Sequence, residues 1–244
     1  MDQKIVLIVG AGDYIGSAIA KRFAQGGFIV CLGRRNGEKL NPIMDEIRSL
    51  GGIAHGFTMD ARKEESVESV FKNIESEIGC IDLVIFNVGG NVFFPILETT
   101  SRVFRKVWEM ATFSGFLTGR EAARYMVPRK RGKIFFTGAT ASLRGAEGYA
   151  AFAAGKAGLR GVAQSLAREL GPKNIHVGHL IIDAGVDTEF VRERIRSSGK
   201  DPNELPPNTL MNPTSVAEAY WNMYKQSPDA WTFEMDLRPF AENW

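Results

Sequence analysis

The stretch KIVLIVGAGDYIGSAIAKRFAQGG, residues 4–27, decides the fold of this chain. It opens with an apolar run, Ile5–Val9, that does not alternate with polar residues, which is typical of a strand buried on both faces. The glycine-rich turn 10–16 follows, and residues 15–25 then show apolar side chains at helical spacing before two glycines. A strand, a tight glycine turn and a helix in this order predict the start of a parallel α/β sheet.

The rest of the sequence repeats this alternation of apolar strands and amphipathic helices. We predict further strands at 28–33, 53–59, 81–87, 132–138, 174–182 and 231–237, and helices near 37–50, 63–77, 100–127, 149–170 and 214–226. No repeat or low-complexity linker divides the chain, so we predict one doubly wound Rossmann-type domain over residues 1–244, with a parallel seven-stranded sheet between two helical layers. The stretch 185–212, rich in charge, Pro and Asn, is predicted to be a loose, mobile lid over a ligand.

The composition argues against several classes of function. Lysine and arginine (30) nearly balance aspartate and glutamate (28), which gives no electrostatic reason to expect nucleic-acid binding. No apolar run reaches the ~20 residues of a membrane span, and the N-terminus lacks the layout of a signal peptide. Cys31 and Cys80 lie in apolar runs and are predicted to be buried thiols in a reducing compartment, so we expect a cytoplasmic protein, and we expect no metal site.

Three glycines in the turn after the first strand suit a dinucleotide. Gly10 would permit the tight turn, Gly12 would let a phosphate approach bare backbone, and Gly16 would let the helix pack closely on the strand. The N-terminus of the following helix offers free N–H groups and the positive end of its dipole to a diphosphate. Because similar turns occur in α/β proteins without a cofactor, the prediction also depends on the residues that follow the second strand.

The end of the second predicted strand indicates which dinucleotide is preferred. NAD-binding folds usually place an acid here to accept a hydrogen bond from the ribose 2′-OH, but this chain has Gly33 followed by Arg34 and Arg35. A guanidinium is a planar fork that suits a 2′-phosphate, whereas a carboxylate would repel it. Two arginines can also belong to a solvated turn, but their position favours NADP(H), and we expect the pair to clamp its phosphate.

With these motifs, the chain resembles the short-chain dehydrogenase/reductase family along almost its whole length. GAGDYIG at 10–16 resembles the family's glycine turn, FNVGG at 86–90 its Asn-Asn-Ala-Gly segment, and AGVDT at 184–188 the loop at the nicotinamide end. The resemblance implies hydride transfer between NAD(P)(H) and a carbonyl or alcohol. The cofactor-binding residues predicted from the turn, the arginine pair and the resemblance are Gly10, Gly12, Tyr14, Ile15, Gly16, Arg34, Arg35, Asp60, Ala61, Asn87, Gly89, Lys156, Val186 and Thr188, with Asp60 beside the adenine.

The resemblance also implies four catalytic positions, of which one keeps the family's residue. The lysine is Lys156, but the tyrosine position is Phe152, the serine position is Ala139 and the asparagine position is Thr112. In the family the tyrosine transfers the proton, and the lysine binds the ribose. Phe152 cannot donate a proton, and general acid–base help of this kind is worth roughly 10²–10⁴-fold in rate. We therefore predict an atypical member that lacks most of the tetrad.

Three hypotheses follow for the chemistry. In the first, Tyr149 supplies the hydroxyl, because it lies seven residues before Lys156 on nearly the same helix face, a spacing that resembles the enoyl reductases of the family. In the second, Thr140, Ser142, His179 or Asp187 transfers the proton to a carbonyl substrate. In the third, the chain binds NADP(H) without turnover.

We favour an NADP(H)-dependent oxidoreductase with a non-standard proton donor, acting on a small carbonyl or enoyl-type substrate, over a non-catalytic NADP(H)-binding protein. The candidate catalytic residues are Lys156, Tyr149, Thr140 and Ser142. Bulky apolar residues on several faces of 106–127 and small residues along 150–167 further predict a homodimer or homotetramer.

Overall fold

The computed structural model describes residues 3–242 and confirms the predicted α/β architecture. Its strands form one parallel sheet in the order β3-β2-β1-β4-β5-β6-β7. The strands are β1 (Ile5–Val9), β2 (Ile29–Arg34), β3 (Ile53–Thr58), β4 (Ile81–Phe86), β5 (Gly132–Thr137), β6 (Ile175–Ile182) and β7 (Glu234–Leu237). The strand order reverses between β1 and β4, and α/β sheets bind ligands beyond the carboxyl ends of the strands at such a point.

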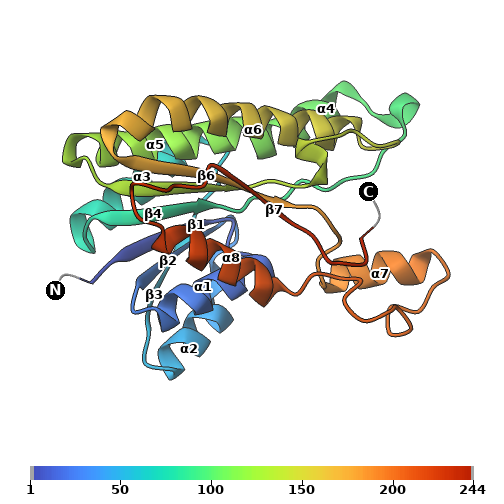
Figure 1. Cartoon of the computed structure of the whole chain (residues 1–244), viewed down its shortest axis with the longest axis horizontal. Coiled ribbons are helices and arrows are strands. Elements are labelled where there is room, and N and C mark those ends of the chain that lie inside the picture. The colour runs from blue at the N-terminus through green and yellow to red at the C-terminus, as the bar shows by residue number, and fades with distance from the viewer. Residues whose placement is uncertain (1–2, 243–244) are drawn as a thin grey trace.

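Helices cover both faces of this sheet (Figure 1). One layer holds α1 (Ile15–Gln25), α2 (Asn41–Ser49) and α8 (Pro213–Lys225), and the other holds α3 (Glu64–Glu77), α4 (Ser101–Trp108), α5 (Ser114–Arg129) and α6 (Ala150–Leu170). A separate apolar core fills the space between the sheet and each layer, and strands such as β1 contribute alternate residues to both cores. This double burial explains why the strands are continuous apolar runs in the sequence.

The helical segment predicted over 100–127 forms two helices, α4 and α5, that a short irregular turn joins. Between α4 and α5 the chain makes a π-helical turn, Glu109–Phe113, which accommodates an extra residue in the helix. The hydroxyl of Ser114 donates to the carbonyl of Met110 at this turn, and both residues line a pocket described below. Turns of this kind are frequent at functional sites, and here the irregularity lies beside one.

The prediction of a loose segment over 185–212 is wrong for residues 189–197. These residues form the helix α7 (Glu189–Ser197), which begins at Thr188 with the hydroxyl accepting a hydrogen bond from the Val191 N–H at 3.1 Å. Arg196 pairs with Glu189 at 2.7 Å and with Glu193 at 2.8 Å, so the charges that suggested a loop stabilise an exposed helix instead.

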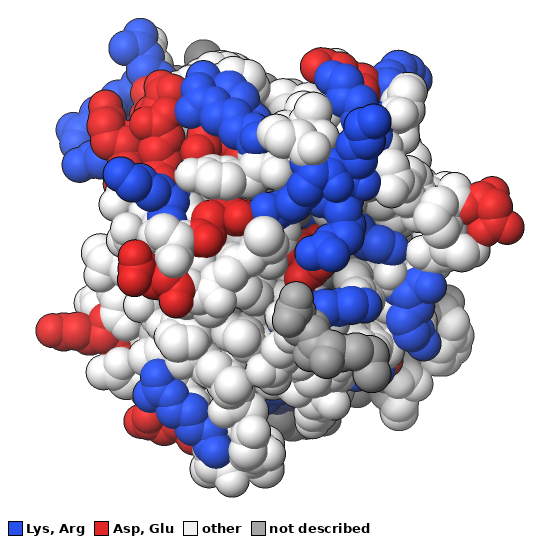
Figure 2. Space-filling model, turned by 90° about the vertical axis from the view of Figure 1, so that its left-hand side faces the viewer, with Lys and Arg blue, Asp and Glu red and all other residues white. Residues whose placement is uncertain are grey.

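The edge of the sheet that holds the amino-terminal ends of the strands lies opposite the ligand-binding edge. Lys and Arg side chains gather on this face, with Asp and Glu side chains beside them (Figure 2). The basic residues near α5 are largely paired with acids: Arg129 lies 2.7 Å from Glu75, and Arg131 lies 3.3 Å from Asp82. These arginines therefore belong to ion pairs of the surface.

The two cysteines differ in their surroundings. Cys31 in β2 is buried as predicted, and burial raises the pKa of its thiol to about 12. The prediction for Cys80 is wrong, because it lies in the turn between α3 and β4 and is exposed. Within residues 3–242, none of the helices combines the length and apolar character that crossing a membrane requires.

Candidate functional site

Two pockets adjoin at the carboxyl ends of the strands. The glycine-turn pocket, of about 350 Å³, lies over β1, β2 and β3. The α7 pocket, of about 500 Å³, lies between the ends of β4, β5 and β6, the start of α6 and α7. Both pockets are lined by Ile15, Asn87, Val88 and Gly89, so they form one continuous site. Every predicted cofactor-binding residue lines one of the two, with Lys156 and Val186 in the α7 pocket and Thr188 in the glycine-turn pocket.

The three turn glycines have the geometry that their predicted roles require. Gly10 has a φ of +87°, and a Cβ built there would lie 2.7 Å from the carbonyl oxygen of Asn87. Gly16 is also confined, because its Cβ would lie 2.7 Å from the Cα of Ala11. Gly12 differs, since no atom of the described residues lies within 4 Å of a Cβ built there. The turn is therefore fixed on both sides and leaves the backbone of Gly12 accessible.

The N-terminus of α1 is open toward the glycine-turn pocket. Its N-cap residue, Tyr14, makes no side-chain cap hydrogen bond, and the first turn contains no acidic residue. The N–H groups at the start of the helix and the positive end of its dipole are thus not satisfied by a neighbouring carboxylate. Together with the open backbone at Gly12, this arrangement fits the diphosphate of a dinucleotide.

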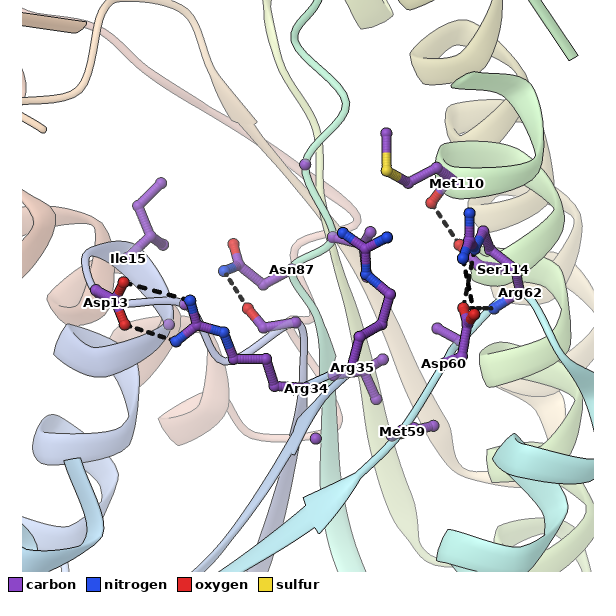
Figure 3. A pocket seen from close by; sticks show the side chains of 18 of the residues that line it. Asp13, Ile15, Arg34, Arg35, Met59, Asp60, Arg62, Asn87, Met110 and Ser114 are labelled. Carbon is purple, nitrogen blue, oxygen red and sulfur yellow. Dashed lines mark hydrogen bonds and ion pairs between the residues drawn. The ribbon is translucent and has the colours of Figure 1, made fainter. Parts of the chain in front are cut away.

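Arg34, the last residue of β2, and Arg35, which follows it, point in different directions (Figure 3). Arg34 pairs with Asp13, with its terminal nitrogens 2.6 and 3.3 Å from the two carboxylate oxygens, and these bonds lower the pKa of Asp13. Arg35 is exposed and extends into the pocket, and its guanidinium has no hydrogen bond or ion pair within the described part of the chain. The predicted clamp of two guanidinium groups is therefore not formed, because Asp13 occupies Arg34.

Asp60, two residues beyond β3, is also held by an arginine. Arg62 places Nε 2.9 Å and Nη2 2.7 Å from its carboxylate oxygens, and the backbone N–H of Arg62 donates to the same group at 3.2 Å. These bonds lower the pKa of Asp60, and both side chains line the glycine-turn pocket. Carboxylates thus neutralise Arg34 and Arg62, two of the three arginines that line this pocket. Arg35 is the third, and its positive charge is unpaired.

Lys156 and Asn87 connect the strand ends where the pockets meet. Lys156 is 3% exposed and donates from Nζ to the carbonyls of Thr137, at 2.8 Å, and Val88, at 3.2 Å. Asn87 donates to the carbonyl of Gly10 at 3.2 Å and accepts from the hydroxyl of Thr137 at 3.0 Å. Burial lowers the pKa of Lys156 to about 8. No carboxylate pairs with this ammonium among residues 3–242, so the site holds a second unpaired cation.

The α7 pocket has Phe152 where the resemblance places a tyrosine. Phe152 and Ala139 both line the pocket and bring no hydroxyl to it. Tyr149 and Thr140, two of the candidate catalytic residues, line it as well. The hydroxyl of Tyr149 accepts a hydrogen bond from Arg194 of α7, whereas the hydroxyl of Thr140 lies beside the carboxylate of Asp183. Tyr149 is therefore the candidate whose own proton is not committed to a carboxylate.

Three other candidates do not line the pockets. Ser142 is buried, and its hydroxyl accepts from the Ala139 N–H at 3.1 Å to close the short turn after β5, so the prediction that it faces a substrate is not supported. His179 is buried in β6 with Nδ1 3.0 Å from Glu234, and burial lowers its pKa to about 4. Asp187 is paired with Arg192 at 2.5 Å. These side chains have structural partners and lie outside the lining of both pockets.

Several residues that shape the site were not found from the sequence. They are Asp13 and Arg62 in the glycine-turn pocket and Arg144 and Arg194 in the α7 pocket. Asp13 had a recognisable signal, because Asp13 follows β1 and Arg34 ends β2, and neighbouring parallel strands bring such positions together. Arg194 had none, since its contact with Tyr149 joins residues that are 45 positions apart.

The fold and the site define a Rossmann-type protein of the kind that binds a dinucleotide at its glycine turn. The chain belongs to the short chain dehydrogenase family, whose model matches residues 4–198. It is therefore an oxidoreductase of this type, and the predicted family is confirmed.

Relatives and solved structures agree with this assignment. The chain is 52% identical to a short-chain dehydrogenase from Rhodopseudomonas palustris, over 98% of this chain and 100% of that one, with a TM-score of 0.83. It is 25% identical to an alcohol dehydrogenase from Thermococcus sibiricus in complex with 5-hydroxy-NADP, over 99% of each chain, with a TM-score of 0.86. It is 29% identical to a probable 2,4-dienoyl-CoA reductase from Bacillus subtilis (strain 168), over 89% of this chain and 87% of the relative.

Proposed function

We propose that this oxidoreductase uses NADP(H), and that Arg35 recognises the 2′-phosphate. The observation that carries the proposal is the unpaired guanidinium of Arg35, since Asp13 and Asp60 neutralise the other two arginines of the pocket. The acid that would accept from the ribose 2′-OH of NAD is replaced here by Gly33 and Arg34. The Thermococcus sibiricus structure, which holds an NADP derivative, supports this choice.

The other contacts to the cofactor follow from the geometry of the site. The backbone at Gly12 and the N-terminus of α1 would hold the diphosphate. Lys156 would bind the nicotinamide ribose, and Val186 and Thr188 would border the nicotinamide end. The cofactor, when bound, supplies the hydride, and the chain supplies orientation and a proton.

Tyr149 is the residue to which we assign the proton. Phe152 has no hydroxyl, and the hydroxyl of Thr140 lies beside the carboxylate of Asp183. The Tyr149 oxygen accepts from Arg194, which leaves its own proton free for an oxygen of the substrate. An oxygen that gains negative charge during reduction would be stabilised by this hydroxyl, because a fixed donor aimed at developing charge lowers the barrier.

The substrate class that suits this arrangement best is an α,β-unsaturated carbonyl compound, with small ketones and aldehydes second. Hydride addition to a conjugated C=C bond places the charge on the carbonyl oxygen, away from the carbon attacked. A proton donor displaced from position 152 can therefore still serve. The similarity to the dienoyl-CoA reductase of Bacillus subtilis supports this order.

The segment 185–212 is proposed to close over the bound substrate. It contributes Gly185, Val186 and α7 residues to the wall of the α7 pocket, and Val186 is tied to Met211 by an isolated parallel bridge. Both ends of the segment therefore meet beside the pocket. Slower proteolysis of this segment in the presence of NADP⁺ and a substrate would support the proposal, and cleavage at an unchanged rate would contradict it.

We also propose that the chain forms a homodimer or homotetramer through α4, α5 and α6. Phe104, Trp108 and Phe116 are 42%, 40% and 39% exposed, and they extend along α4 and α5. Large apolar side chains exposed together along one helical face mark an interaction surface. Light scattering should give twice or four times the mass of one chain, whereas a monomer at micromolar concentration would contradict the proposal.

The activity is tested by following NADPH consumption with two panels of substrates. One panel contains crotonyl thioesters and other enones, and the other contains small ketones and diketones. We expect faster consumption with the first panel, and faster consumption of NADPH than of NADH. If the protein binds NADPH but consumes it with neither panel, the non-catalytic alternative replaces this proposal.

A further inference from the structure

The α7 pocket contains more positive than negative charge. Arg144, Lys156 and Arg194 line it, and Glu242 is its one carboxylate among the residues described. No ion pair joins Glu242 to Arg144 or Arg194 in that part of the chain. The remaining lining is largely apolar and includes Ala139, Phe152, Ile182, Phe190 and Val191. A neutral substrate would leave Lys156 and Arg194 without a counter-ion among the residues described.

Arg194 is held in position without being neutralised. Its guanidinium donates to the hydroxyl of Tyr149 and lies 5.4 Å from the centre of the Tyr149 ring and 5.9 Å from that of Phe93. It forms no ion pair with any carboxylate within residues 3–242, although Arg196 on the same helix pairs with two. Aromatic contacts restrict a guanidinium to one place and leave its other N–H groups available for a ligand.

Arg144 approaches the same pocket from the turn after β5. It donates to Asp183 over distances of 3.1 to 3.3 Å, and the same carboxylate accepts from Arg238 at 3.0 and 3.2 Å. Asp183 is 1% exposed, while the side chain of Arg144 is 43% exposed. Arg238 also pairs with Asp236 at 2.5 Å, so the two guanidinium groups share two carboxylates, and Asp183 both orients Arg144 and balances its charge. The side chain of Arg144 stays partly exposed, so its remaining N–H groups can bind a ligand together with those of Arg194.

We propose that the substrate carries an anionic group, a carboxylate or a phosphate, which Arg144 and Arg194 bind in the α7 pocket. This inference rests on the proposed function, because it assigns a substrate class to the same site. The guanidinium fork matches both anions with two parallel hydrogen bonds. The apolar side chains around it would hold a short hydrocarbon body beside Phe152, with the reacting oxygen near Tyr149.

Pairs of probes that differ only in charge test this assignment. The carboxylate arm compares crotonate with crotonamide, and the phosphate arm compares dihydroxyacetone phosphate with dihydroxyacetone. Binding is measured by calorimetry on the protein saturated with NADP⁺ and again on the protein alone. We expect at least one anion to bind about 10-fold or more tightly than its neutral partner, because hydrogen bonds between charged groups are stronger than those between neutral groups.

The variants Arg194→Gln and Arg144→Gln should each reduce this preference to about 3-fold or less, and Arg196→Gln is the matched control on the same helix that should retain it. If just one of the two arms shows a preference, that arm identifies the anion as a carboxylate or as a phosphate. Equal binding of anionic and neutral probes to the wild type would overturn the inference, as would a preference that both variants retain.

The failure of this inference can be distinguished from that of the proposed function. If NADP⁺ binds but neither anion is preferred, only the substrate class is wrong. If NADP⁺ does not bind, the proposed function fails, and the titrations of the protein alone still decide whether the two arginines bind an anion. Thermal unfolding of each variant shows whether a lost preference reflects the loss of the fold.

Discussion

The glycine-turn pocket and the α7 pocket are built from different parts of the chain. The first depends on backbone: a positive φ at Gly10, open space at Gly12 and a helix that begins without a side-chain cap. The second depends on side chains, and Phe152 and Ala139 stand where the resemblance places a tyrosine and a serine. Phe152 packs with Val107 in a small apolar cluster, so a phenylalanine in place of a tyrosine leaves this packing intact. Chemistry carried by single side chains can thus change while a binding site made from backbone persists.

The largest effect in this comparison is expected from Tyr149→Phe. The variant removes the proposed proton donor and leaves the glycine-turn pocket untouched, so turnover should fall by about 10²–10⁴-fold. The affinity for NADPH should stay within about 2-fold. The measurements are steady-state consumption of NADPH with the best enone and calorimetric titration of the cofactor.

Phe152→Tyr sharpens the same test, because it returns a phenol to the position that the family uses. We expect ketone reduction to rise in this variant, with little change for enones. Unchanged turnover in Tyr149→Phe would contradict the assignment of the proton to Tyr149, and a loss of NADPH binding in that variant would show that the two pockets are not separable.

Gly12→Val is expected to weaken cofactor binding in the glycine-turn pocket. A Cβ built at this position has no atom of the described chain within 4 Å, so the free energy of unfolding should change by less than about 0.5 kcal/mol. The side chain would fill the space next to the open N-terminus of α1, and NADP⁺ should bind about 100-fold more weakly. Gly171→Val is the control, since it also adds a side chain in open space but lies outside both pockets.

Arg35→Ala should change the preference between cofactors and leave the pocket intact. Loss of a charge-assisted contact to the 2′-phosphate predicts binding of NADP⁺ about 10- to 100-fold weaker, with NAD⁺ nearly unchanged. Arg48→Ala is the control, because this exposed arginine of α2 lines neither pocket. Equal losses for NADP⁺ and NAD⁺ would mean that Arg35 contacts a part that both cofactors share.

The smallest effect concerns the dependence of stability on pH. Burial lowers the pKa values of Lys156 and Lys133 to about 8, while the unfolded chain keeps both protons up to about pH 10.5. The unfolded state therefore binds more protons between these values, and the free energy of unfolding should rise as the pH increases from 8 to 10. Lys156→Met should reduce this slope in urea denaturation. An identical slope in the variant would show that folding does not lower the pKa of Lys156.

The fold and the lining of the site could be predicted from the sequence because they follow from local patterns. Continuous apolar strands predicted the parallel sheet, and the glycine turn and the motifs that resemble the family predicted cofactor-binding residues that all line the two pockets. Such patterns depend on residues that are close together in the sequence, so a single sequence is sufficient to identify them.

What could not be predicted depends on contacts between distant residues. Arg34 was expected to face a phosphate, but Asp13, 21 positions earlier, holds it. Ser142 was expected at the substrate, but its hydroxyl closes a local turn. The charged residues of α7 suggested a loop, but they form ion pairs along a helix. In each case, a polar side chain had several possible partners, and the tertiary structure determined which one it contacts.

The central claim is that the glycine-turn pocket binds a phosphorylated dinucleotide although the family's phenol is absent at position 152. Calorimetric titration of the wild-type protein with NADP⁺ and with NAD⁺ tests it most directly. We predict that NADP⁺ binds at least about 10-fold more tightly than NAD⁺, through the unpaired guanidinium of Arg35. Equal or tighter binding of NAD⁺, or no binding of either cofactor at millimolar concentration, would contradict the claim.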